Sequence, residues 1–81
     1  MAGAAQIAAT IEFYHLPRFG GGKHVEKRPF AVGTTVRDVL FRYGLEAEAR
    51  LTQLVNGRHA NLDQVIRDGD LLSVFYQPEG G

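Results

Sequence analysis

The sequence predicts an α+β domain in which one helix packs against one mixed sheet. Residues 7–14 alternate apolar and polar side chains, which is typical of a strand buried on one face. Residues 34–44 carry one capped helix with a single apolar stripe. Residues 71–76 are a nearly continuous apolar run, which is typical of a central strand. One helix between strands packs most economically on one face of a single sheet.

Composition limits the classes of function. The 81 residues suffice for one small domain over residues 1–81, with residues 1–6 expected as a disordered lead-in. The absence of cysteine excludes disulfides and cysteine-based metal sites, and the net charge of zero argues against a nucleic-acid binder. The start has no basic signal-peptide segment, and no apolar run approaches the roughly 20 residues of a membrane span. We therefore expect a soluble, cytoplasmic protein without membrane or nucleic-acid partners.

Two strands and a loop are predicted before the helix. In the first strand, residues 7–16, the side chains alternate between an apolar face (Ile7, Ala9, Ile11, Phe13) and a second face (Thr10, Glu12, Tyr14). Residues 17–24, PRFGGGKH, have the composition of a loop. Residues 25–32 predict a second strand. Pro29 cannot donate to a strand ladder, so this strand belongs at a sheet edge or carries a bulge.

The helix has clear start and stop signals. Thr35 is expected to cap it, with Asp38 in the capping-box position. Gly44 is expected to end it. The spacing i, i+3, i+4, i+7 gives one apolar stripe, made of Val36, Val39, Leu40 and Tyr43. Residues 45–50 can add a short helical turn supported by an i, i+4 ion pair.

The second half of the chain predicts a hairpin, a connector and a last strand. Residues 51–60 read as a strand that enters an Asn56-Gly57 turn, a strong hairpin signal. Residues 61–70 form a connector that ends in a turn around Asp68-Gly69. Residues 71–76 are the last strand, which brings the sheet to four or five strands, and residues 77–81 are expected as a flexible tail.

This order of elements, with LVNG…LDQVIRDGDLLSVFYQPEGG over residues 54–81, resembles the MoaD/ThiS family of ubiquitin-like sulfur carriers. The spacing is most similar to that of the small subunit of molybdopterin synthase. The matching positions are Val55-Asn56, Asp63, Asp68-Gly69-Asp70, Phe75, Pro78 and Gly80-Gly81. The resemblance implies a β-grasp sheet with parallel, central first and last strands and a free C-terminal tail. The family commonly has two prolines and a small or apolar residue before the glycines, whereas this chain has Gln77-Pro78-Glu79.

The resemblance also implies a role as a carrier without catalytic residues, bound metal or bound cofactor. An E1-like adenylyltransferase of the MoeB/ThiF type would use ATP to adenylate the carboxylate of Gly81. Sulfur would then displace AMP and leave a thiocarboxylate, which a large synthase subunit of the MoaE type would receive. Gly80 would give access to the acyl carbon, because glycine has no side chain to block it, and Pro78 would stiffen the tail.

A docking surface is expected on the side of the sheet away from the helix. Tyr14 and Phe75 lie together there if the first and last strands are neighbours, and an exposed aromatic pair is a typical interface core. The family's contact patch maps onto Tyr14, His59 and Phe75. The alternative is that the glycine-rich loop at residues 19–24 covers Phe75.

Other features favour structural interpretations. His15, His24 and His59 lie far apart in the sequence and are interpreted as solvated or loop histidines instead of zinc ligands. GGGK at residues 20–23 lacks the rest of a phosphate-binding loop. Asp68 and Asp70 are interpreted as turn formers, with contact to a partner near the base of the tail as the weaker alternative.

Three further functions remain open. The sulfur could serve thiamin thiazole or another thiolated metabolite. The chain could instead be a ubiquitin-like modifier conjugated to lysines, or a β-grasp binding module in which the terminal glycines have no role.

Overall fold

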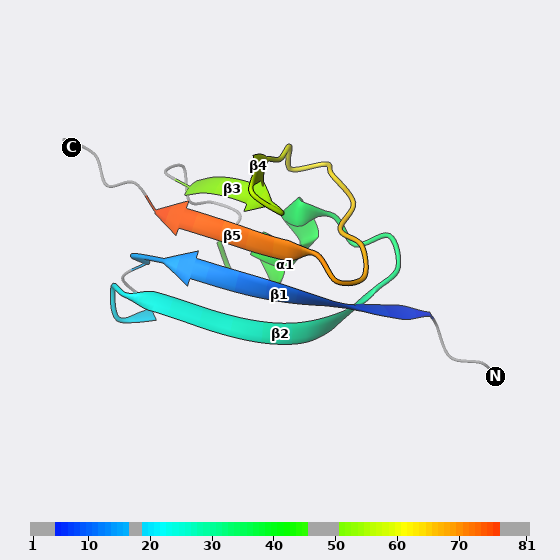
Figure 1. The fold of residues 1–81 in the computed structure, drawn as a ribbon, viewed down its shortest axis with the longest axis horizontal. Helices are drawn as coiled ribbons and strands as arrows, with labels where there is room; N and C mark the ends of the chain where they lie inside the picture. Colours follow the sequence, from blue (N-terminus) through cyan, green and yellow to red (C-terminus); the bar gives the residue numbers. More distant parts are fainter. Residues whose placement is uncertain (1–4, 17–18, 46–50, 77–81) are drawn as a thin grey trace.

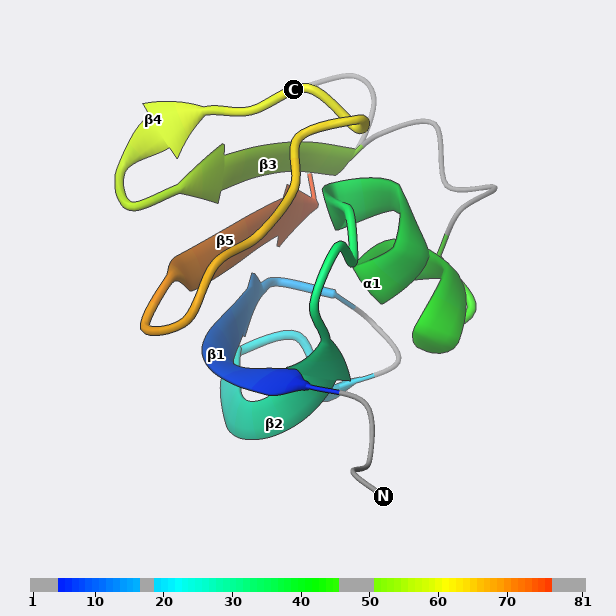
Figure 2. The same ribbon diagram turned by 90° about the vertical axis from the view of Figure 1, so that its right-hand side faces the viewer.

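The structure is a computed structural model that describes residues 5–16, 19–45 and 51–76. Its elements are β1 (Gln6–Tyr14), β2 (Lys23–Ala31), α1 (Val36–Arg42), β3 (Leu51–Val55), β4 (Arg58–His59) and β5 (Leu71–Tyr76). The five strands form one sheet in the order β2-β1-β5-β3-β4 (Figure 1). β1 and β5 are parallel and the other pairs antiparallel, and α1 lies against one face (Figure 2). The predicted β-grasp architecture, with its parallel central pair, is confirmed.

The hydrophobic core lies between α1 and the covered face of the sheet. The alternation predicted for β1 is confirmed, because Ala9, Ile11 and Phe13 are buried. The ring of Phe13 stacks on Phe19 at 4.7 Å and meets the edge of Tyr43 at 4.8 Å between centroids. No helix among the described residues is long and apolar enough to cross a membrane.

Both ends of α1 agree with the sequence signals. The Thr35 hydroxyl accepts a hydrogen bond from the Asp38 amide, and the Asp38 carboxylate accepts one from the Thr35 amide, which completes the capping box. Gly44 follows the helix with a φ of 74°, a conformation that favours glycine. The additional turn was predicted for residues 45–50; Leu45 is not helical, and residues 46–50 lie outside the described residues.

Two boundaries differ from the prediction. β1 begins at Gln6, which pairs with Ala31, so residue 6 is not part of a disordered lead-in. β2 begins at Lys23 instead of residue 25, because the register continues through His24 opposite Phe13. The His24 ring stacks on Phe19 at 4.6 Å, so the interpretation of His24 as a loop histidine was wrong. β2 is an edge strand, as Pro29 predicted.

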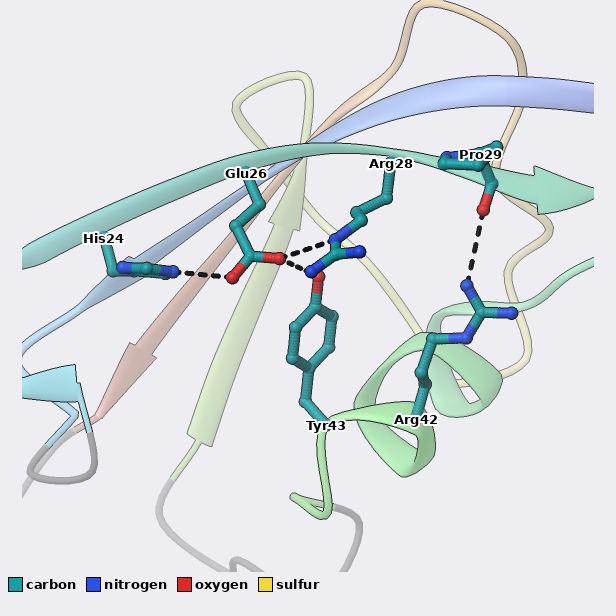
Figure 3. Close-up of polar contacts among 6 residues, drawn as sticks. All are labelled: His24, Glu26, Arg28, Pro29, Arg42 and Tyr43. Carbon is teal, nitrogen blue, oxygen red and sulfur yellow. Dashed lines mark hydrogen bonds and ion pairs between the residues drawn. The ribbon is translucent and has the colours of Figure 1, made fainter.

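A polar network fixes the edge strand β2 to the helix (Figure 3). The Glu26 carboxylate lies 2.6 Å from His24 Nε2 and accepts hydrogen bonds from Arg28 Nε at 2.7 Å and the Tyr43 hydroxyl at 2.9 Å. These bonds lower the pKa of Glu26 from its ordinary value of 4.5 to about 2, the bond from His24 having the largest effect. The ionised form of Glu26 therefore stabilises the contact between β2 and α1.

Replacing this carboxylate should make the stability less dependent on pH. Because the pKa of Glu26 is lower in the folded state, its contribution is complete above about pH 4.5 and is lost as the pH falls toward 2. Since Arg28 and His24 are partly exposed, we expect Glu26→Gln to cost only about 1 kcal/mol at pH 7. Urea unfolding at pH 7 and pH 3 tests this. The matched variant Asp63→Asn, which breaks an exposed pair with Arg37, should change the free energy of unfolding little at either pH. An equal loss of stability in Glu26→Gln at both pH values would contradict the prediction.

The turns of the second half are confirmed, and their acids have structural roles. Asn56 and Gly57 have φ values of 53° and 84°, as a type I′ hairpin turn requires. Asp70 accepts hydrogen bonds from the Asn56 side chain and the Arg67 amide, both at 2.8 Å. Asp68 accepts a bond from the Ala8 amide at 2.8 Å.

The position of the second turn corrects one alternative. Asp68 and Asp70 precede Leu71, the first residue of β5, whereas the tail follows Tyr76 at the other end of that strand. A strand advances about 3.3 Å per residue, so β5 separates these acids from the start of the tail by its whole length. Asp68 and Asp70 are therefore not acids at the base of the tail.

Candidate docking site on the open face of the sheet

Tyr14 and Phe75 meet on the face of the sheet opposite α1. Val74 is fully buried on the covered face, so Phe75, the next residue of β5, points to the open face. Tyr14 is the parallel partner of Phe75 in the register of β1 and β5. The two rings stack at 4.6 Å between centroids with 8° between their planes, and both side chains are half-buried. Stacked rings of this kind form a flat, apolar surface with little rotational freedom.

Polar side chains hold the Tyr14 ring in place. The Tyr14 hydroxyl donates to Glu12 Oε1 at 2.8 Å, and the Ser73 hydroxyl donates to the same oxygen at 3.3 Å. Lys23 Nζ lies 3.5 Å from Glu12 Oε2 and 5.5 Å from the centroid of the Tyr14 ring. The hydrogen bond from Tyr14 is the largest cause of a lowered pKa at Glu12, so this carboxylate is ionised at neutral pH. The aromatic pair therefore has a charged, hydrogen-bonded border on the side of β2.

The predicted site residues are only partly brought together. Tyr14 and Phe75 are in contact, but His59 lies on β4 opposite Leu54, with the whole of β3 between it and β5. Phe19, the aromatic residue of the glycine-rich loop, stacks on Phe13, which is buried on the face of the sheet that α1 covers. Pro78, Gly80 and Gly81 lie outside the described residues.

This face carries a stacked aromatic pair beside the Glu12 carboxylate and the Lys23 ammonium group. Within residues 5–16, 19–45 and 51–76, no group of three or more His, Cys, Asp or Glu side chains could hold a metal ion. Phe75 is followed by Tyr76, the last residue of β5, so this strand ends beside the stacked rings. Lys23 and Ser73 were not predicted to lie on this face. The alternation of β1 already placed Glu12 there, whereas the position of Lys23 depends on the pairing of β2.

The fold and this open face define a ubiquitin-like β-grasp protein. The chain is similar to a protein of Pyrococcus furiosus described as molybdopterin converting factor, subunit 1, with 22% identity, a TM-score of 0.69 and coverage of 89% of this chain and 99% of the other. It is similar to SAMP1 of Haloferax volcanii, with 19% identity, a TM-score of 0.71 and coverage of 91% and 99%.

A third structural neighbour is the ubiquitin of Caldiarchaeum subterraneum, with 16% identity, a TM-score of 0.66 and coverage of 95% and 100%. These likenesses establish the fold. No protein-family model matches the sequence, and no curated protein matches it.

Proposed function

We propose that this protein is a sulfur carrier whose C-terminal Gly81 is converted to a thiocarboxylate. The observation that supports the proposal most is the position of β5. This central strand ends at Tyr76, directly beside the stacked pair of Tyr14 and Phe75. A partner bound to the aromatic pair therefore meets the start of the tail, and five further residues, fully extended, reach about 16 Å at roughly 3.3 Å each.

The reaction requires Gly81 to bear a free carboxylate. An E1-like adenylyltransferase binds ATP. The Gly81 carboxylate attacks the α-phosphate of this ATP to form an acyl-adenylate, and pyrophosphate is released. A sulfide-equivalent donor then attacks the acyl carbon and displaces AMP, so that one carboxylate oxygen is replaced by sulfur. Gly80 and Gly81 present no side chain to this attack, and the proposed reaction requires no acid, base or metal from the carrier itself.

The pathway proposed for this sulfur is the synthesis of molybdopterin, in the cytoplasm. The similarity to a molybdopterin converting factor subunit supports it, as does the spacing of the motifs in residues 54–81. In this pathway a large synthase subunit would accept the tail. Thiamin thiazole or another thiolated metabolite is the alternative acceptor.

A second candidate, conjugation to proteins, is favoured by the similarity to a ubiquitin. Both candidates begin with adenylation of Gly81, so they share the proposed tail chemistry. They differ in what is transferred: a carrier gives up sulfur and is released, whereas a modifier stays attached to a lysine through an amide bond.

Intact-mass spectrometry tests the proposal. The chain is incubated with a candidate activating enzyme, ATP and a sulfide donor, and then with iodoacetamide. Because the chain has no cysteine, an alkylated adduct at near-neutral pH that maps to Gly81 reports the thiocarboxylate with little background. We expect the exchange of oxygen for sulfur together with this adduct. A chain that stays unmodified with every activating enzyme of its own cell would refute the role as a sulfur carrier. Species of higher mass in which the chain is linked to lysines would establish the role as a protein modifier.

A further inference from the structure

An open pocket lies between the β3–β4 hairpin and the connector at residues 61–70. Its volume is about 620 Å³, within the range of small-ligand sites. The polar side chains that line it include Arg58, His59, Gln64, Arg67 and Asp70. The pocket borders the beginning of β5, so it is distinct from the Tyr14–Phe75 pair near the end of that strand.

Hydrogen bonds hold the connector wall of this pocket. The Val36 amide donates to the Gln64 carbonyl and the Ile66 amide to the Thr34 carbonyl, both at 2.9 Å. Arg37 also pairs with Asp63, which ties the connector to the start of α1. The connector is therefore a fixed wall and needs no ordering when a ligand binds.

The hairpin wall is fixed in a similar way. The Asn56 amide donates to the Leu71 carbonyl at 2.8 Å, and the Leu71 amide donates to the Asn56 side-chain oxygen at 2.9 Å. Asp70, the acid of the pocket, already accepts bonds from Asn56 Nδ2 and the Arg67 amide through its two oxygens. These bonds occupy the carboxylate, so it does not compete strongly for the guanidinium groups nearby.

The two arginines of the pocket have unused donors. Among the described residues, Arg28 and Arg37 pair with carboxylates and Arg42 donates to the Pro29 carbonyl, whereas the guanidinium groups of Arg58 and Arg67 have no such partner. The formal net charge of the chain is zero, yet the residues that line the pocket include two arginines and one aspartate. It is therefore a local positive site with free, directional donors.

We infer that this pocket binds the phosphate group of a small ligand. A carboxylate is satisfied by one guanidinium fork, whereas the three oxygens of a phosphate group accept from two forks. The volume leaves room for a small polar substituent on the phosphate. The site is separate from the proposed carrier chemistry and does not depend on it.

Titration of the full-length protein with three probes tests this assignment. Inorganic phosphate, glycerol 3-phosphate and acetate are added to ¹⁵N-labelled protein at constant ionic strength, and amide shifts are followed by NMR. We expect saturable shifts at the Asn56-Gly57 turn, Arg58 and Arg67 with both phosphates. Tighter binding of the monoester would identify a phosphate ester as the ligand, and tighter binding of the free ion would identify phosphate itself. Equal binding of acetate would overturn the assignment.

Charge-matched variants show whether the two arginines are responsible for phosphate binding. Arg58→Gln and Arg67→Gln should each weaken phosphate binding by about tenfold, because each removes a charge-assisted fork. Lys27→Gln removes the same charge from the opposite edge of the sheet and should change binding by less than about twofold. All three side chains are exposed, so the fold should persist, which the remaining amide signals verify. Unchanged binding in both arginine variants, or equal loss in Lys27→Gln, would overturn the inference. No activating enzyme is used, so this outcome is independent of the thiocarboxylate test.

Discussion

Deleting Gly80 and Gly81 is expected to abolish thiocarboxylate formation and to leave the stability of the fold unchanged. The proposed chemistry acts only on the carboxylate of Gly81, so the truncated chain would end on Glu79, whose side chain obstructs the acyl carbon. Among the residues that the structure describes, the buried core extends from Ala9 to Val74. The free energy of unfolding should therefore stay within about 0.5 kcal/mol of the full chain. Intact mass after activation and urea unfolding measure the two quantities.

The control for this deletion lies in the same tail. Glu79→Gln alters a charge next to the glycines and retains both of them, so it should still form the thiocarboxylate. A truncated chain that is modified as efficiently as the full chain would disprove the role of Gly81. Unaltered binding of a cellular partner by the truncated chain, with no modification of either form, would instead support a β-grasp binding module.

Much of the fold was predictable because its strongest signals are local. The capping box needs only Thr35 and Asp38, three residues apart. The Asn56-Gly57 turn needs two adjacent residues that accept positive φ. The alternation in β1 identified its buried side chains, and Pro29 identified the edge strand, since each follows from backbone geometry within one element.

The contacts that sequence reasoning missed connect distant elements. Tyr43 donates to Glu26 across 17 positions, and the Ala8 amide donates to Asp68 across 60. The register of β2 extends through Lys23 because Phe19 and His24 stack over the core, a contact with no signal in the composition of the loop.

The candidate docking site was also predictable only in part. Tyr14 and Phe75 were placed together by assuming that β1 and β5 are neighbours, an assumption taken from the resemblance and confirmed by their pairing. The phosphate pocket was not foreseen, because Arg58 and Arg67 line one pocket only when the connector folds back beside the hairpin. Side chains that meet only through tertiary structure leave no periodic pattern in the sequence.

Truncating the Phe75 ring should weaken docking more than it weakens folding. We expect Phe75→Ala to weaken binding to the activating enzyme by about 30-fold, because central aromatic anchors contribute about 2 kcal/mol or more to an interface. Phe75 is half-buried and stacks on Tyr14 outside the main core. The loss of folding stability should therefore be smaller, at about 1 kcal/mol, which reflects the lost ring contact.

Two matched variants make the result for Phe75 interpretable. Tyr14→Phe keeps the stacked ring and removes the hydroxyl that bonds Glu12, so it should weaken binding by only about threefold. Phe41→Ala truncates an aromatic side chain on α1, on the other side of the sheet, that is 66% exposed, and should leave the affinity unchanged. Titration calorimetry gives the affinities, and urea unfolding corrects them for the folded fraction. If Phe75→Ala binds like the wild type, or if Phe41→Ala loses as much affinity, the stacked pair is not the docking surface. A selective loss in Phe75→Ala, with Tyr14→Phe between it and the wild type, would establish that the partner binds beside the point at which the tail leaves the sheet.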